Sequence, residues 1–462
     1  MQHIAQYVAK CAVFEIILDV SVKAYLIIIA CMITTLSYNP ALADEAVCNT
    51  SKLRAETIED IRIALDENYI HRERIGDLQT GLAAYITQGT YEKIKTPSEF
   101  AAQLSNDLID LSQDYHFSVF YQPDIANSDD PQTSAVVDAL FSEDELAGLK
   151  RSNFGFQSLE ILEGNIGYVR FDSFPDPAHA FEIGAAAMRF VENTDAVIFD
   201  MRYNRGGHNQ FGQFITSYFY EPSDHRMIHK YAYMDEGKLI SGEYWTIPLL
   251  PGKRMPDVPV FVLTSTTTFS AGEWFAFELQ KLGRATLIGQ TTTGASHAVS
   301  RVPINSCFWL QLPVGTGRDP IDNSDFEGVG VTPDIKIDAS RAKSLAHVLA
   351  LKSLAEKAPA RQVEVDWFLP VLEARLNPAD LDSRDLERFE GTYDGRQIRL
   401  QNGQLTYHWR ERFQLTLRRL NENTFLVEGG NDFRFRFIEK DGAVIALERI
   451  ESDGGVISYA RQ

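Results

Sequence analysis

Cysteine is scarce in this sequence: only four of its 462 residues are cysteines, and only Cys48 and Cys307 lie beyond residue 43. So small a number excludes a cysteine-rich scaffold and a zinc site built from cysteines. In an exported protein the two thiols could form a disulfide. They could equally be two unrelated buried thiols, and the sequence leaves both alternatives open.

Basic residues are also few relative to acidic ones, 44 against 64, which gives a formal net charge of −20. This balance argues against binding to the phosphate backbone of a nucleic acid, which needs a basic surface. The sequence also lacks the HExxH, phosphate-loop and dinucleotide-binding motifs. We therefore expect neither a metal ion nor a cofactor.

The N-terminal apolar run is short. It extends from Ala24 to Met32 after Lys23, and the small-x-small pattern Ala41-Leu-Ala43 follows. This layout predicts a signal peptide over residues 1–43, with an apolar core too short to act as a stop-transfer helix. We expect an exported protein, periplasmic or extracellular, without stable membrane insertion after cleavage. A lipoprotein attached through Cys31 and an N-terminal membrane anchor are the less favoured alternatives.

The apolar pattern divides the remaining chain into four parts. Residues 44–130 have helical periodicity and predict a helical domain. In residues 131–340 apolar strands alternate with helices, which predicts an α/β core whose sheet is covered on both faces. Residues 341–380 predict a helical linker, and the alternating pattern of residues 381–462 predicts a small antiparallel β module. In α/β sheets, reactive groups collect beyond the carboxyl ends of the strands.

Ser270 lies at such a strand end. It follows the apolar run that ends at Thr264, and Phe269-Ser-Ala-Gly-Glu273 opens a predicted helix. A hydroxyl in this position lies beside free backbone N–H groups that can stabilise an oxyanion. The local sequence alone also fits a simple helix N-cap, a position that serine fills routinely.

Three further segments carry groups that a serine nucleophile needs. Gly206 and Gly207 follow the strand of residues 196–202, where glycines expose backbone N–H groups. His116 could serve as a base because histidine titrates near working pH. Glu327 could orient the imidazole. Taken singly, each of these residues could be purely structural.

Together the segments resemble the tail-specific, or C-terminal processing, serine protease family, and most closely the branch near tricorn core protease and interphotoreceptor retinoid-binding protein. The resemblance covers about residues 153–337, with weaker support around His116. The motifs occur in family order: Asn153-Phe-Gly-Phe156, Gly164-Asn-Ile-Gly-Tyr168, Asp200-Met-Arg-Tyr-Asn-Arg-Gly-Gly207, Phe269-Ser-Ala-Gly-Glu273, Leu282-Gly-Arg-Ala-Thr-Leu-Ile-Gly289 and Glu327-Gly-Val-Gly-Val-Thr-Pro-Asp334.

The resemblance implies a ββα-superhelix core of the Clp/crotonase type. It implies that Ser270 is the nucleophile and that the N–H groups of Ala271 and Gly206 form the oxyanion hole, with Gly207 as the near alternative. One branch of the family uses a lysine base, but Ala295 stands in the lysine position here. The tricorn-like branch uses a histidine and a distant glutamate, and these positions correspond to His116 and Glu327. That branch can also carry a serine beside the histidine, where this chain has Tyr115.

Two more side chains are candidates for the same site. His297 and Asn204 could line the pocket, and His297 could replace His116 as the base. The segment before Asn153 is too short for a PDZ domain, so recognition of substrate C-termini is not implied. The sequence therefore predicts a serine-type peptidase acting on a polypeptide substrate. An esterase or amidase, and a non-catalytic protein that binds apolar ligands on the same fold, remain the alternatives.

Overall fold

The computed structural model describes residues 47–122, 143–376 without residue 236, 383–410, 413–430 and 432–462. The predicted signal peptide, its Cys31 alternative and the anchor alternative lie outside the described residues. The chain forms two compact units. Of the described residues, the first comprises 47–113, 117–122 and 300–312, and the second comprises 114–116, 143–299 and those within 313–462. No helix in the described part of the chain is long and apolar enough to cross a membrane.

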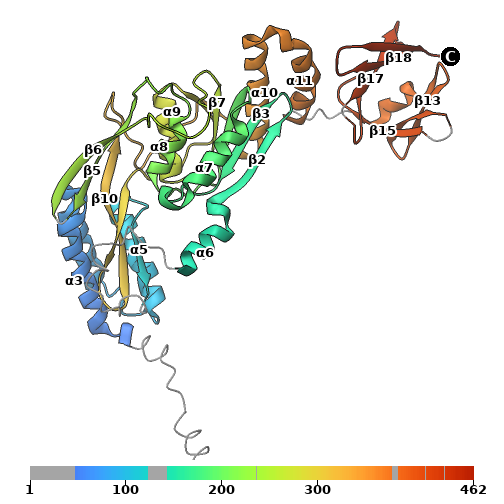
Figure 1. The fold of residues 1–462 in the computed structure, drawn as a ribbon. Coiled ribbons are helices and arrows are strands. Elements are labelled where there is room, and N and C mark those ends of the chain that lie inside the picture. Colours follow the sequence, from blue (N-terminus) through green and yellow to red (C-terminus); the bar gives the residue numbers. More distant parts are fainter. Residues whose placement is uncertain (1–46, 123–142, 236, 377–382, 411–412, 431) are drawn as a thin grey trace, which may run out of the picture. The chain divides into compact units, whose positions relative to one another are not determined.

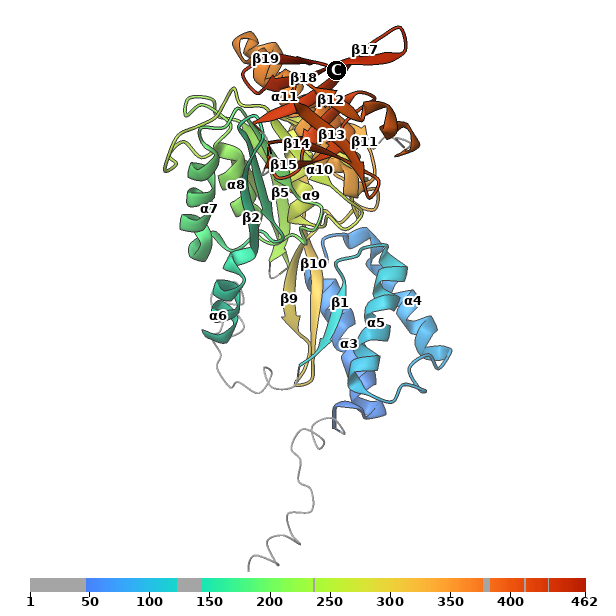
Figure 2. The ribbon, with the colours of Figure 1, turned by 90° about the vertical axis from the view of Figure 1, so that its right-hand side faces the viewer.

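The first unit is mainly helical, as predicted. It contains α3 (Ser51–Asn68), the short helix η1 (Arg72–Arg74), α4 (Ile75–Thr87) and α5 (Pro97–Ser112). Helix α5 begins at a capping box formed by Thr96 and Glu99. Figure 2 shows α5 beside β1 (Ser118–Tyr121), which pairs with the first part of β10 (Phe308–Arg318). A disulfide joins Cys48 to Cys307 within this unit, which settles the alternative that the sequence left open.

The second unit is built on a six-stranded sheet in the order β11-β8-β7-β4-β3-β2. Strand β2 (Phe156–Leu162) is antiparallel to β3 (Ile166–Phe171). The other neighbours are parallel: β4 (Ala196–Asp200), β7 (Val260–Thr264), β8 (Ala285–Gly289) and β11 (Ile335–Lys336). Strands β4 and β7 are buried along their whole length, which explains their uninterrupted apolar sequences.

Helices cover both faces of this sheet (Figure 1). On one face α7 (Pro177–Val191), α8 (Asn209–Ser217) and α9 (Ala271–Lys281) pack in one hydrophobic core. On the other face α10 (Ala339–Lys357) and α11 (Gln362–Leu376) form a second core, with η3 (Pro359–Arg361) between them. Helix α6 (Glu143–Arg151) and η2 (Asn153–Gly155) precede β2. The predicted α/β core is thereby confirmed.

The second unit also contributes strands to a second sheet. The hairpin of β5 (Met227–Asp235) and β6 (Lys238–Trp245) pairs with the later residues of β10, with Gly315 opposite Tyr233. Strand β9 (Ala298–Pro303) also pairs with β10.

The C-terminal residues form the predicted antiparallel module. Eight strands pair in sequence order after η4 (Ser383–Phe389), and a bridge between Tyr393 and Arg461 links the first strand to the chain end, so that the sheet nearly closes on itself. A core that includes Phe389, Phe435 and Phe437 fills the interior. The strands are β12 (Gly391–Tyr393), β13 (Arg396–Gln401), β14 (Gln404–Trp409), β15 (Phe413–Arg419), β16 (Thr424–Val427), β17 (Phe433–Lys440), β18 (Ala443–Glu451) and β19 (Val456–Ala460).

Candidate active site

Ser270 occupies a strained turn between β7 and α9. Its backbone angles are φ 53° and ψ −122°, a combination that residues with a side chain rarely adopt. The N–H groups of Glu273 and Trp274 donate to the backbone carbonyl of Ser270 at 2.8 and 3.0 Å. A capping serine ordinarily has extended backbone angles. The conformation of Ser270 therefore differs from that of an ordinary N-cap.

The carboxylate of Glu273 holds this turn in place. It is fully buried and accepts the N–H of Ser270 at 2.9 Å, the N–H of Gly294 at 2.7 Å and the N–H of Ala295 at 3.0 Å. The hydroxyl of Thr292 donates to the same carboxylate. Burial raises the pKa of Glu273, and these four donors oppose the rise. One buried carboxylate thus connects the turn at Ser270 to the segment that leads to His297.

The turn at Gly206 and Gly207 passes directly against Ser270. A Cβ atom added to Gly206 would lie 2.7 Å from the Ser270 Cβ and 3.0 Å from the Ala271 nitrogen. The Gly206 N–H donates to Asn204 Oδ1 at 2.9 Å. Among the described residues, none accepts a hydrogen bond from the N–H of Ala271 or Gly207. Two backbone donors beside Ser270 are therefore open to a ligand oxygen.

The side chain of Asn204 holds this turn through hydrogen bonds to the backbone. It is fully buried, and its amide nitrogen donates to the Phe171 carbonyl at 2.8 Å while its Oδ1 accepts from Gly206. Its backbone carbonyl accepts the N–H of Phe269 at 3.0 Å, which ties the glycine turn to the segment before Ser270. The side chain of Asn204 is thereby committed to backbone partners.

His116 lies close to the residue that precedes Ser270. Its ring centroid is 4.9 Å from that of Phe269, and only 2% of the residue is exposed. The backbone N–H of His116 donates to Asp114 Oδ1 at 2.9 Å, and His116 Nδ1 is 3.6 Å from the same oxygen. Between them in the sequence, Tyr115 is half exposed. The sequence argument assigned no role to Asp114, although it stands only two residues from His116.

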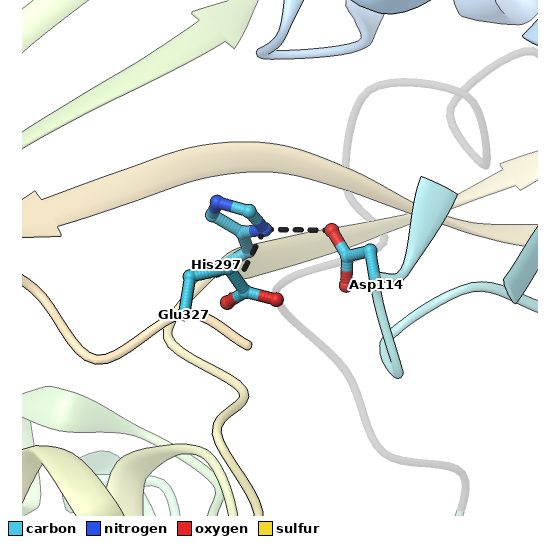
Figure 3. A group of neighbouring side chains, drawn as sticks. All are labelled: Asp114, His297 and Glu327. Carbon is cyan, nitrogen blue, oxygen red and sulfur yellow. Dashed lines mark hydrogen bonds and ion pairs between the residues drawn. The ribbon is translucent and has the colours of Figure 1, made fainter. Parts of the chain in front are cut away.

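His297 and Glu327 meet Asp114 in one buried group (Figure 3). His297 Nδ1 is 2.6 Å from Asp114 Oδ2 and 3.5 Å from Glu327 Oε2. The same Glu327 oxygen accepts the N–H and the hydroxyl of Ser296 at 2.6 and 3.0 Å. The contacts of the Glu327 carboxylate are thus with Ser296 and His297, and its charge also acts on His116.

The four ionisable groups influence one another strongly. Burial raises the pKa of Asp114, but hydrogen bonds and charge from His116 and His297 outweigh burial and hold that pKa well below its usual range. Burial lowers the pKa of His297, yet Asp114, Glu327 and Asp325 together raise it above its ordinary value. Burial raises the pKa of Glu327, with the nearby histidines opposing the rise. The contacts within the group therefore favour the charged forms of both Asp114 and His297.

Asp114, His297 and Glu327 each place one potential metal-ligating atom within 4.8 Å of the others. However, the ring nitrogen of His297 that would serve as ligand is the one that contacts Asp114 at 2.6 Å. A nitrogen that donates its proton to a carboxylate has no lone pair for a metal ion. We therefore interpret the trio as a hydrogen-bonded group.

Two family models match this chain, each over a different part. Residues 165–337 match peptidase family S41. Residues 41–155 match the N-terminal domain of peptidase S41 in eukaryotic IRBP.

Individual proteins of similar sequence are named C-terminal processing proteases. A carboxy-terminal-processing protease from Bartonella bacilliformis is 25% identical over 189 residues, which cover 38% of this chain and 40% of the relative. A carboxyl-terminal-processing protease from Picosynechococcus is 26% identical over 205 residues, covering 44% and 46%. The chain thus spans less than half the length of these relatives. The solved photosystem II D1 C-terminal processing protease aligns with a TM-score of 0.39 at 15% identity, covering 63% of this chain and 94% of that one.

Proposed function

We propose that this chain, whose residues 165–337 match peptidase family S41, is a serine peptidase that hydrolyses polypeptides through an acyl-enzyme on Ser270. The observation that carries the proposal is the turn at Ser270. A residue with a side chain is held at positive φ, directly against a glycine turn, with an imidazole ring packed on its neighbour Phe269. Serine nucleophiles of other hydrolases stand on comparable strained strand-to-helix turns.

In this mechanism His116 accepts the hydroxyl proton while Ser270 Oγ attacks the carbonyl carbon of the substrate. The oxyanion that forms is stabilised by the N–H of Ala271 and by an N–H of the glycine turn. The sequence favours Gly206 as this second donor. However, the N–H of Gly206 already donates to Asn204 Oδ1, so we favour the N–H of Gly207 as the donor to the oxyanion.

The tetrahedral intermediate collapses when the C–N bond breaks and His116 returns the proton to the leaving amine. A water molecule then gives up a proton to His116 and attacks the acyl-enzyme. The carboxylic acid product departs, and the proton returns to Ser270. We assign Glu327 the task of supporting the histidine base, and its place 3.5 Å from His297, in the same group as Asp114, supports this assignment.

We also propose that the protein works outside the cytoplasm. The Cys48–Cys307 disulfide supports this location, because structural disulfides persist in oxidising compartments and are rare in reducing ones. The predicted signal peptide points to the same compartment.

Hydrolysis assays test the proposal. The purified protein is incubated with an unfolded casein and, separately, with a small activated ester, alongside Ser270→Ala and His116→Ala. The exposed Ser340 lies in helix α10, and Ser340→Ala is the matched control. We expect casein cleavage by the wild type and by Ser340→Ala, and a loss of about 10²-fold or more in the other two variants.

Two results would contradict this proposal. Ester hydrolysis without any casein cleavage would indicate the esterase or amidase alternative. No hydrolysis of either substrate by the folded protein would favour the alternative of a non-catalytic binding protein.

A further inference from the structure

Asp114 is shared by two buried imidazoles. One carboxylate oxygen, Oδ1, accepts the backbone N–H of His116 at 2.9 Å and lies 3.6 Å from His116 Nδ1. The other, Oδ2, lies 2.6 Å from His297 Nδ1. All three residues are at most 3% exposed. The Glu327 carboxylate contacts His297 and Ser296 in the same group.

His297 is held in place by helix α9, whose N-cap residue is Ser270. The Glu273 carboxylate accepts the N–H groups of Gly294 and Ala295. The indole N–H of Trp274 donates to the Ser296 carbonyl at 2.8 Å. Because these bonds fix the three residues before His297, the helix that carries the nucleophile also places the imidazole that contacts Asp114.

His297 lies between two carboxylates. Its Nδ1 is 2.6 Å from Asp114 Oδ2 and 3.5 Å from Glu327 Oε2. A carboxylate buried as deeply as that of Asp114 would be costly without a hydrogen-bond donor, and an N–H at His297 Nδ1 offsets that cost. His297 can therefore hold Asp114 in a fixed position beside His116.

We infer that Asp114 is the residue that orients the base His116, and that His297, which lies between Asp114 and Glu327, is a second positioning residue that fixes Asp114. The inference rests on the proposed function, because it assigns roles within the same site. It makes Asp114 an acid partner that contacts the base directly, through Oδ1 at 3.6 Å from His116 Nδ1. A 3.6 Å separation suits this role, since catalytic hydrogen bonds are often long before substrate binds.

Substitutions that keep shape but change hydrogen bonding test this inference. Asp114→Asn removes the charge of the orienting group. His297→Asn keeps an N–H donor near the position of Nδ1, whereas His297→Ala removes it. For each variant, kcat and KM are measured on the casein or ester substrate that the wild type cleaves, and circular dichroism verifies folding.

We expect Asp114→Asn and His297→Ala to lower kcat by about 10²–10⁴-fold, the range of general-base catalysis, with KM little changed. His297→Asn should recover much of the kcat that His297→Ala loses. If Asp114→Asn does not fold, the two His297 variants decide by themselves.

Three results would overturn the inference. Wild-type kcat in Asp114→Asn would show that Asp114 does not orient the base. Equal losses in His297→Asn and His297→Ala would show that the imidazole itself takes part in the chemistry. An increase in KM alone would indicate a role in substrate binding. A wild type that cleaves nothing, by contrast, would refute the proposed function and not this assignment of roles.

Discussion

Ser270 adopts a backbone conformation that only its surroundings can hold. Its φ of 53° is unfavourable for any residue with a Cβ atom, and sites of this kind usually cost on the order of 1–3 kcal/mol. The Glu273 carboxylate and the close approach of Gly206 keep the turn in place. This turn brings Ser270 directly against the glycine turn at Gly206.

Gly206→Ala is expected to impair catalysis strongly. The new methyl group would lie 2.7 Å from the Ser270 Cβ, so that the oxyanion donors must move. Loss of one well-placed donor lowers kcat by about 10²–10³-fold, and we expect a decrease of this size in kcat/KM. Gly283→Ala is the matched control, since Gly283 also has positive φ but has nothing within 4 Å of the added Cβ. Equal activity of the two variants would contradict the close approach.

The contribution of His297 to stability should depend on pH. Its pKa is raised, because the hydrogen bond and charge of Asp114 outweigh the lowering effect of burial. A histidine whose pKa rises on folding stabilises the protein fully below its unfolded pKa of about 6.5, and this stabilisation disappears as pH rises through the folded pKa.

The free energy of unfolding of the wild type should therefore exceed that of His297→Asn most at about pH 6, and the difference should shrink toward about pH 9. Urea unfolding at a series of pH values measures this difference. A difference that stays constant or grows with pH would be inconsistent with the raised pKa.

At the level of residues, Ser270, Gly206 and Gly207 could be proposed as site residues from the sequence, because each follows a buried apolar strand. It could not supply Asp114 and Glu273 as partners. Their roles depend on contacts with His297 and with residues 292–295, which are distant along the chain, and no local pattern encodes such contacts.

At the level of elements, helix α9 positions several groups of the candidate site. Its first residues present the N–H of Ala271, its Glu273 side chain binds the turn at Ser270, and its Trp274 indole holds Ser296. Glu273 occupies the same capping-box position in α9 as Glu99 does in α5. The difference is burial: Glu273 is fully buried, whereas Glu99 is exposed.

Glu273→Gln should therefore destabilise the protein. An amide keeps one acceptor oxygen and turns an NH₂ group toward two of the donors. Each unsatisfied buried group costs about 1–3 kcal/mol, and we expect the free energy of unfolding to fall by about 2–4 kcal/mol. Glu99→Gln, the exposed control, should change it by less than about 1 kcal/mol. The midpoints of urea unfolding give both values, and equal midpoints would refute the clamping role of Glu273.

The elements themselves were largely predictable. Strands β4 and β7 are continuous apolar runs because they are buried on both sides. The order of strands in the six-stranded sheet was not predictable, because register between distant strands is set by packing in three dimensions.

On the scale of the whole chain, the helical N-terminal region, the α/β core and the antiparallel C-terminal module agree with the apolar pattern of the sequence. The pairing of Cys48 with Cys307 was left open, because a disulfide depends on the distance between two segments 259 residues apart. The near closure of the C-terminal sheet through Tyr393 and Arg461 was equally beyond the alternating pattern.

The central claim is that Ser270 is an activated nucleophile. Its most direct test is to treat the protein with a fluorophosphonate and to locate the adduct by peptide mass spectrometry, with Ser270→Ala and His116→Ala treated in parallel. The account predicts one phosphonylated residue, Ser270, with no adduct in Ser270→Ala and much slower labelling in His116→Ala. An adduct on another residue, or no adduct on the folded wild-type protein, would contradict it.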